Sequence, residues 1–186
     1  LMNYSYTETL WILLPCSVVI SFTQTINNYH LIESKKNAIF VIIPAMVISL
    51  TAVIIYENSI DISKIVGSFL LFTGAIKFSS RVQSYLYIIM KKHIQPYYLF
   101  IGFVHGISNM GGGPLSIFMS LVHTDKEQVR TNIAFIYLIL VIFQLVVLSI
   151  MSNTSLKSEV MLLIPISLIT YIFTSKIISP IINKEN

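Results

Sequence analysis

Long apolar runs separated by short polar links dominate the sequence. Six of these runs approach the roughly 20 apolar residues that a helix needs to cross the hydrocarbon layer, and they cover about residues 6–29, 38–56, 62–78, 97–123, 133–151 and 160–182. A seventh run, "SYLYIIM" at 84–90, is too short to cross, and we interpret it as an extension of the third helix or as an interfacial helix. The pattern predicts an all-α, polytopic helical membrane protein with about six transmembrane spans.

Composition agrees with this prediction and excludes other classes of protein. Of the 186 residues, 55% are hydrophobic and 11% are charged, and the mean hydropathy is +0.79, whereas soluble domains carry about 25% charged residues. The single cysteine, Cys16, can form neither an internal disulfide nor a thiolate metal site. Basic residues lie at the ends of apolar runs and form no nucleic-acid surface. We expect the lipid bilayer as a partner, with no nucleic acid, metal or cofactor; the oligomeric state is left open.

The basic residues also predict an orientation. With six alternating spans, one membrane side holds Lys35, Lys36, Lys77, Arg81, Lys91, Lys92 and Lys157. The other side holds Lys64, Lys126, Arg130 and Lys184, together with the acidic residues Glu57, Asp61, Asp125 and Glu127. Because basic loops stay in the cytoplasm, we expect the first side to be cytoplasmic in a multi-pass protein of the cell membrane, the inner membrane of a bacterium.

One apolar run, "GFVHGISNMGGGPLS" at 102–116, contains five of the seven glycines. Gly102 and Gly106, four positions apart, favour close packing of two helices. Three consecutive glycines before Pro114 instead favour a break, because glycine destabilises a helix interior by roughly 1 kcal/mol relative to alanine and proline suits a first helical turn. We predict a half-helix from 97 to 108, an unwound link from Asn109 to Gly113 near mid-membrane, and a second half-helix from Pro114 to 123.

The predicted break has the properties of an anion site. The N-terminus of the second half-helix would present unpaired N–H groups and the positive end of a helix dipole. Irregular backbone at membrane depth persists where it is buried in protein or lines a polar cavity, and broken helices are a sequence indication of a transporter's substrate site. All eight acidic residues fall near span ends or in links, which predicts an anion path without carboxylates.

An internal repeat is also indicated. A shift of 121 positions places "FVIIPAMVIS" (40–49) on "MLLIPISLIT" (161–170), so that Pro44 falls on Pro165. Residues 1–93 then form an incomplete first repeat without its opening glycine-rich span, and residues 94–186 form an incomplete second repeat without its last span. We expect a fragment or a minimal version of an eight-span protein. Four spans per repeat would give both halves the same orientation, with Pro44 and Pro165 at similar depths.

The glycine-rich run, followed by "DKEQVRTNIAF", resembles the signature of the sulfite exporter TauE/SafE family. The resemblance implies an eight-span permease of two similar halves that exports sulfite, sulfonates or related sulfur-containing anions. It extends weakly over the whole chain and is specific only at 102–116. The chain departs from the signature at Asn109, where glycine is common, and it lacks the first-half motif. Asparagine is the next best residue for left-handed backbone.

The candidate substrate-binding residues border the break: His105, Ser108, Asn109, Gly111, Gly112 and Gly113. His105 is open to two interpretations, a proton relay or substrate ligand and a histidine satisfied by a neighbouring helix. Lys126 and Arg130 are expected to mark the membrane surface, with attraction of anions as the lesser interpretation. Gln24, Thr25, Asn27 and Asn28 fit a pathway and a helix end at the headgroups equally well.

Two classes of function remain. The first is a permease for small anions, which is not an enzyme and has no catalytic residues. The second is a membrane-embedded enzyme or an accessory subunit, in which the glycine-rich segment only serves helix packing. The sequence has no His-Glu-x-x-His, no Gly-x-Ser-x-Gly and no pair of intramembrane carboxylates, and this favours the permease. The coupling ion and the direction of transport are open.

Overall fold

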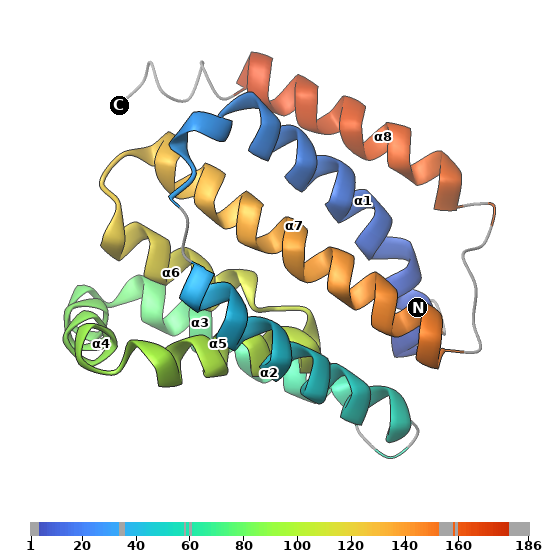
Figure 1. Cartoon of the computed structure of the whole chain (residues 1–186), viewed down its shortest axis with the longest axis horizontal. Helices are drawn as coiled ribbons and strands as arrows, with labels where there is room; N and C mark the ends of the chain where they lie inside the picture. The colour runs from blue at the N-terminus through green and yellow to red at the C-terminus, as the bar shows by residue number, and fades with distance from the viewer. Residues whose placement is uncertain are drawn as a thin grey trace.

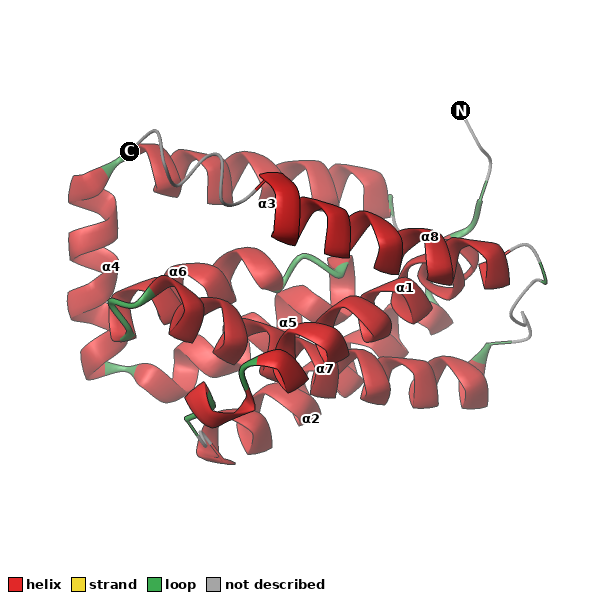
Figure 2. Ribbon diagram, turned by 90° about the horizontal axis from the view of Figure 1, so that it is seen from above, coloured by secondary structure: helices red, strands yellow, loops and turns green. Residues whose placement is uncertain are grey.

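The computed structural model describes residues 4–33, 36–57, 59, 61–152, 158 and 160–178. Within these ranges the chain is helical and contains no strand, which confirms the all-α prediction (Figures 1 and 2). The α-helices are α1 (Tyr6–Asn27), α2 (Lys36–Ile55), α3 (Ile62–Phe78), α4 (Ser80–Lys92), α5 (Ile94–Ser108), α6 (Gly112–Val122), α7 (Lys126–Met151) and α8 (Val160–Phe173). A 3-10 turn, Tyr29–Leu31, follows α1, and a π-helical turn, Thr174–Ile178, follows α8.

Side-chain caps fix where the long helices begin. Ser5 and Glu8 form a reciprocal capping box at the start of α1. The carboxylate of Asp125 accepts from the backbone N–H of Gln128 at 2.8 Å, so that α7 begins seven residues before the predicted span, in polar sequence. Pro44 lies inside α2 and Pro165 inside α8.

Three helical segments in the described part are long and apolar enough to cross a membrane: α1, α7 and residues 160–177. A bent pair, α3 with α4, would provide a fourth. α4, which contains the short apolar run 84–90, turns by 96° from α3 and crosses the bundle direction (Figure 2). It is therefore a separate helix rather than an extension of the third span, and its direction favours the interfacial interpretation.

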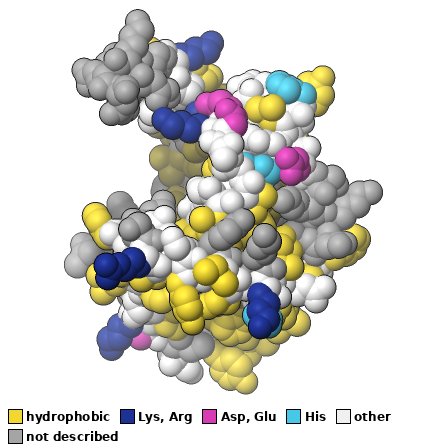
Figure 3. Space-filling model, turned by 90° about the vertical axis from the view of Figure 1, so that its left-hand side faces the viewer, with side chains coloured by type: hydrophobic (Ala, Val, Ile, Leu, Met, Phe, Trp, Pro, Cys, Tyr) yellow, Lys and Arg dark blue, Asp and Glu magenta, His cyan; other side chains and the backbone are white. Residues whose placement is uncertain are grey.

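Large apolar side chains cover much of the outside of the bundle. Leu71, Phe40, Ile150 and Leu162 are each more than two-thirds exposed. Figure 3 looks onto one end of the bundle, where Lys, Arg, Asp, Glu and His side chains lie beside apolar ones. A water-soluble protein rarely exposes such extended apolar patches. The surface is that of a polytopic helical membrane protein.

The glycine-rich run is broken as predicted, but its halves fold back on each other. α5 ends at Ser108 and α6 begins at Gly112, so the non-helical link is residues 109–111, shorter than predicted. The hydroxyl of Tyr97 donates to the carbonyl of Pro114 at 2.7 Å, and the ring centroids of Tyr98 and Phe118 lie 5.4 Å apart.

Residues 20 positions apart in a straight helix are separated by about 30 Å, so the contact of Tyr98 with Phe118 requires a reversal of direction. α5 and α6 form a re-entrant hairpin whose two outer ends lie at the same end of the bundle (Figure 1). The expectation of a crossing span over 97–123 is therefore wrong, and Pro114 is the third residue of α6 rather than its first.

The reversal gathers the basic residues at one end of the bundle. The elements at this end carry basic residues: α4 (Arg81 and Lys92), the start of α7 (Lys126 and Arg130) and the turn after α8 (Lys176). We call this the basic end. At the opposite end the only described lysine or arginine is Lys64, which pairs with Asp61 at 2.9 Å. Lys35, Lys157 and Lys184 lie outside the described residues. The positive-inside rule assigns the basic end to the cytoplasm, and Lys126 and Arg130 lie there rather than on the opposite side as predicted.

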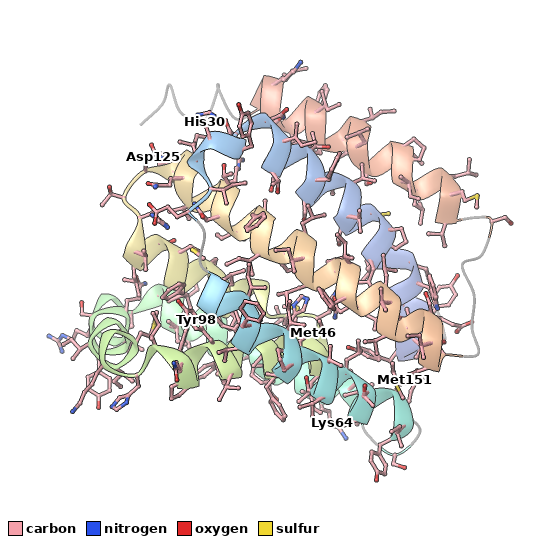
Figure 4. All side chains as sticks on the ribbon, viewed as in Figure 1. His30, Met46, Lys64, Tyr98, Asp125 and Met151 are labelled. Atoms are coloured by element: carbon pink, nitrogen blue, oxygen red, sulfur yellow. The ribbon has the colours of Figure 1, made fainter. Side chains whose placement is uncertain are left out.

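α1 and α7 are antiparallel neighbours. His30 and Asp125 lie at the basic end and Met151 at the other (Figure 4), and Asn28 after α1 donates to Glu127 in the first turn of α7 at 3.4 Å. The 121-position shift pairs these two helices. The expectation that both halves share one orientation is therefore wrong, while the duplication itself and its boundary near residue 93 stay predictions.

Candidate functional site

The break between α5 and α6 is built by left-handed backbone at Asn109. Its φ of 56° and ψ of 15° fall in the left-handed region, and its N–H donates to the carbonyl of His105 at 2.8 Å, which closes α5. No described glycine has a positive φ. Asparagine tolerates this conformation better than most residues. The turn of the chain therefore depends on Asn109, and the three glycines that follow have another role.

The glycines permit close approach of neighbouring side chains. A Cβ atom at Gly111 would lie 2.5 Å from the Cβ of His105, and one at Gly112 would lie 3.3 Å from the ring of Tyr137. Gly102 and Gly106 do the same between α5 and α2, where a Cβ would overlap backbone oxygens of Ile42 and Met46. The packing role predicted for Gly102 and Gly106 is confirmed.

A cleft of about 720 Å³ leads to the break. Its floor includes Ser108, Asn109 and Met110, and its walls come from the start of α1, the α2–α3 link and the start of α3: Tyr4, Ser5, Tyr6, Thr9, Leu10, Leu13, Glu57, Asp61, Ile62, Val66, Gly67 and Leu70. These walls lie at the end of the bundle opposite the basic end. The break contacts Tyr137 near the middle of α7, since the Tyr137 hydroxyl donates to the carbonyl of Asn109 at 3.3 Å. The residues that line the cleft therefore extend from one end of the bundle to about half its depth.

Only some of the polar groups at the floor of the cleft have a hydrogen-bond partner. Ser108 donates to the carbonyl of Val104 at 2.8 Å and accepts from the N–H of Met110 at 3.3 Å, so its hydroxyl proton is engaged. The side-chain oxygen of Asn109 is buried without a hydrogen-bond partner among the described residues. Tyr6 crosses from α1 and donates to the carbonyl of Gly106 at 3.0 Å.

Behind the floor lies a buried polar pair. The Nε2 atom of His105 lies 3.1 Å from the Oε1 atom of Gln144 on α7, and both side chains are completely buried. His105 Nδ1 and Gln144 Nε2 have no partner in the described part of the chain. The His105 ring meets that of Tyr137 edge to face, with centroids 5.0 Å apart. Because a Cβ at Gly111 would lie 2.9 Å from Nδ1, this unpartnered nitrogen faces the break.

The structure gathers the six candidate residues in one region but gives them different positions. Ser108 and Asn109 line the cleft. Gly111 and Gly112 pack against His105 and Tyr137, and His105 lies behind the floor. Gly113 lies in the first turn of α6, where its N–H donates to the carbonyl of Met110 at 3.1 Å.

Two side chains of this region had no place in the sequence prediction. Gln144 is the only glutamine of the apolar run 133–151, a signal that could have identified it as buried and functional. Glu57 lies in a link, yet the structure places it on the wall of the cleft beside Asp61. The expectation of a path free of carboxylates is therefore wrong for this cleft, because the α2–α3 link folds against the start of α1.

Comparison with protein families decides the class. The family model described as "Sulfite exporter TauE/SafE" matches residues 2–185, nearly the whole chain. The chain belongs to the sulfite exporter TauE/SafE family. No curated protein and no solved structure matched it. As a member of this family it is an integral membrane transporter of sulfite or related sulfur-containing anions, and the helical bundle with its apolar surface agrees with that class.

Proposed function

We propose that this TauE/SafE member exports a small sulfur-containing anion, sulfite or a sulfonate, across the cell membrane of a bacterium, and that the anion binds at the break between α5 and α6. One observation carries the proposal: the break lines a cleft of about 720 Å³ whose other lining residues extend to one end of the bundle. Transporters place substrate sites at such interrupted helices near mid-membrane.

The electrostatics of the floor suit an anion. In the first turn of α6, Pro114 has no N–H and the N–H of Gly113 donates to the carbonyl of Met110. The start of the helix therefore offers an anion the N–H of Gly112 and the positive end of the helix dipole. The described residues of the floor are uncharged, and Asn109 brings an amide group. An anion of one or two charges therefore meets donors there and no repelling carboxylate.

His105 adds a donor that depends on its tautomer. With the proton on Nε2, the ring donates to Gln144 Oε1 and turns a lone pair toward the break, which an anion would not favour. If the Gln144 amide is reversed, its NH₂ donates to Nε2, and the proton on Nδ1 then faces the break. The second arrangement is the one we assign to the anion-bound state. It supports the ligand interpretation of His105 and needs no proton relay.

The test is efflux of labelled sulfite from vesicles that contain the protein, with membrane abundance measured in parallel. Asn109→Asp adds a negative charge to the floor at nearly constant size, and we expect efflux to fall at least tenfold. Asn109→Gly keeps the left-handed backbone without the amide, and we expect a smaller loss. Asn27→Asp adds the same charge on an exposed residue at the basic end and serves as the matched control.

Efflux by Asn109→Asp at the wild-type rate and normal abundance would remove the break from the transport path. The alternative, an enzyme or accessory subunit in which the glycines serve packing alone, would then be favoured, since Gly102 and Gly106 already have that role.

A further inference from the structure

We propose that Glu57 is the protonatable group that controls anion occupancy of the cleft: its carboxylate opposes the anion, and its protonated form admits it. This inference rests on the proposed function and concerns the regulation of the same site. It would couple anion binding to proton binding. The sequence alone offers no candidate for such a coupling group, because all eight acidic residues fall near span ends or in links.

Glu57 is held at a fixed place on the cleft wall. It follows the end of α2, and its Oε1 atom accepts from the backbone N–H of Thr7 at 3.0 Å, while Oε2 accepts from the Thr7 hydroxyl at 3.2 Å. Both donors belong to the first turn of α1, where the helix dipole also favours a negative charge. The side chain is partly buried and lines the cleft together with Tyr6, so an anion that moves between the break and the cleft opening passes it.

Among the described carboxylates that line the cleft, Glu57 is the one without a lysine or arginine partner. From α3, Asp61 lines the cleft but is paired with Lys64 at 2.9 Å. From α1, Glu8 is engaged in the capping box with Ser5 and does not line the cleft. The phenols of Tyr4 and Tyr6 face the cleft, and the break contributes the uncharged Ser108 and Asn109. Among the described residues, no lysine or arginine pairs with Glu57.

This arrangement makes anion binding and protonation support each other. Two like charges on opposite sides of a cleft of this size, roughly 10 Å apart, repel by an amount equivalent to about tenfold in affinity at an effective dielectric constant of about 20. Protonation of Glu57 removes that repulsion. Linkage is reciprocal, so the bound anion must favour the protonated carboxyl by the same factor, and anion affinity must rise as the pH falls.

The experiment measures the Kd of methanesulfonate for the purified chain by calorimetry across a pH series that runs from neutral to about pH 3.5, below the ordinary titration range of a glutamate carboxyl. Methanesulfonate keeps one negative charge over this range, so only the protein titrates. We expect the wild-type Kd to decrease about tenfold on acidification. Glu57→Gln mimics the protonated form, and we expect it to bind about tenfold more tightly than wild type at neutral pH, with no dependence on pH.

Two further variants separate charge from structure. Glu57→Asp retains the titrating group and should retain the pH dependence. Glu8→Gln removes a carboxylate from the same end of the bundle, outside the cleft, and should behave as wild type. A pH-independent wild-type Kd, a Glu57→Gln variant that keeps the pH dependence, or one that binds more weakly at every pH would overturn the role of Glu57 and leave the anion site intact. Failure of the wild type to bind methanesulfonate and sulfite at any pH would overturn the proposed function as well.

Discussion

Gly106→Ala should separate α2 from α5, because the two helices touch at this glycine. A Cβ at position 106 would overlap the hydroxyl of Ser49 and the carbonyl of Met46, and it would lie 2.8 Å from the backbone nitrogen of Leu50. Two of these three atoms are backbone, so no change of rotamer relieves the contact. Overpacking of a tight interface lowers the stability of a protein by about 1–3 kcal/mol. Alanine has a higher helix propensity than glycine, and this raises the stability by roughly 1 kcal/mol. We expect a net loss of up to about 2 kcal/mol in the free energy of unfolding.

Gly74→Ala is the matched control. Gly74 also lies inside a helix, α3, but a Cβ there has no neighbour within 4 Å. Only helix propensity changes, so this variant should gain up to about 1 kcal/mol. The measurement is unfolding in detergent micelles with increasing sodium dodecyl sulfate, followed by circular dichroism. Opposite shifts of the two midpoints are expected.

The double variant Gly106→Ala/Ser49→Ala tests the explanation itself. Removal of the Ser49 hydroxyl takes away one of the three overlapping atoms and leaves both backbone atoms in place. The double variant should therefore recover less than half of the lost stability. Full recovery, or a Gly106→Ala protein as stable as wild type, would show that the backbones of α2 and α5 are not in the contact described.

Three other substitutions test separate parts of the structure. Gln144→Leu removes the partner of His105 Nε2 and leaves the imidazole unpaired in the bundle, so it should destabilise by about 1–3 kcal/mol in the same unfolding measurement. Asn132→Ala removes side-chain bonds that tie α7 to Leu31 and Glu33 after α1; we expect a loss of about 1–2 kcal/mol and faster proteolysis in that link. Gly112→Val places a branched side chain against the ring of Tyr137 and should abolish sulfite efflux at normal membrane abundance, because valine preserves the hydropathy on which insertion depends.

The position of the break could be predicted from sequence because it depends on local chemistry. Three glycines before Pro114 disfavour a continuous helix and so indicate the region of the break, although the turn itself is made by the left-handed backbone of Asn109, and Gly112 and Gly113 are helical. The reason for each glycine could not be predicted in the same way. Gly111 and Gly112 are needed because His105 and Tyr137 approach them, and Tyr137 comes from a different helix, whose placement is a property of the packed bundle.

The reversal at the break and the position of Glu57 escaped prediction for a related reason. A three-residue link permits a straight continuation and a hairpin alike, and contacts such as Tyr98 with Phe118 select the hairpin. Glu57 has the sequence context of an ordinary link residue. Its place on the cleft wall follows from hydrogen bonds to Thr7, fifty positions earlier in the chain. Neither contact leaves a periodic or compositional signal.

The α5–α6 hairpin changes the number of membrane crossings in each unit of the proposed duplication. A hairpin that enters and leaves at one end contributes no crossing, so a unit made of such a hairpin and three spans crosses the membrane an odd number of times. Two successive units of the proposed duplication would then stand upside down relative to each other, in agreement with the opposite directions of α1 and α7. Units in this arrangement are related by a twofold axis in the plane of the membrane. Rotation about that axis exchanges the two aqueous faces, so that if the two units swap conformations, a cleft open to one face becomes an equivalent cleft open to the other.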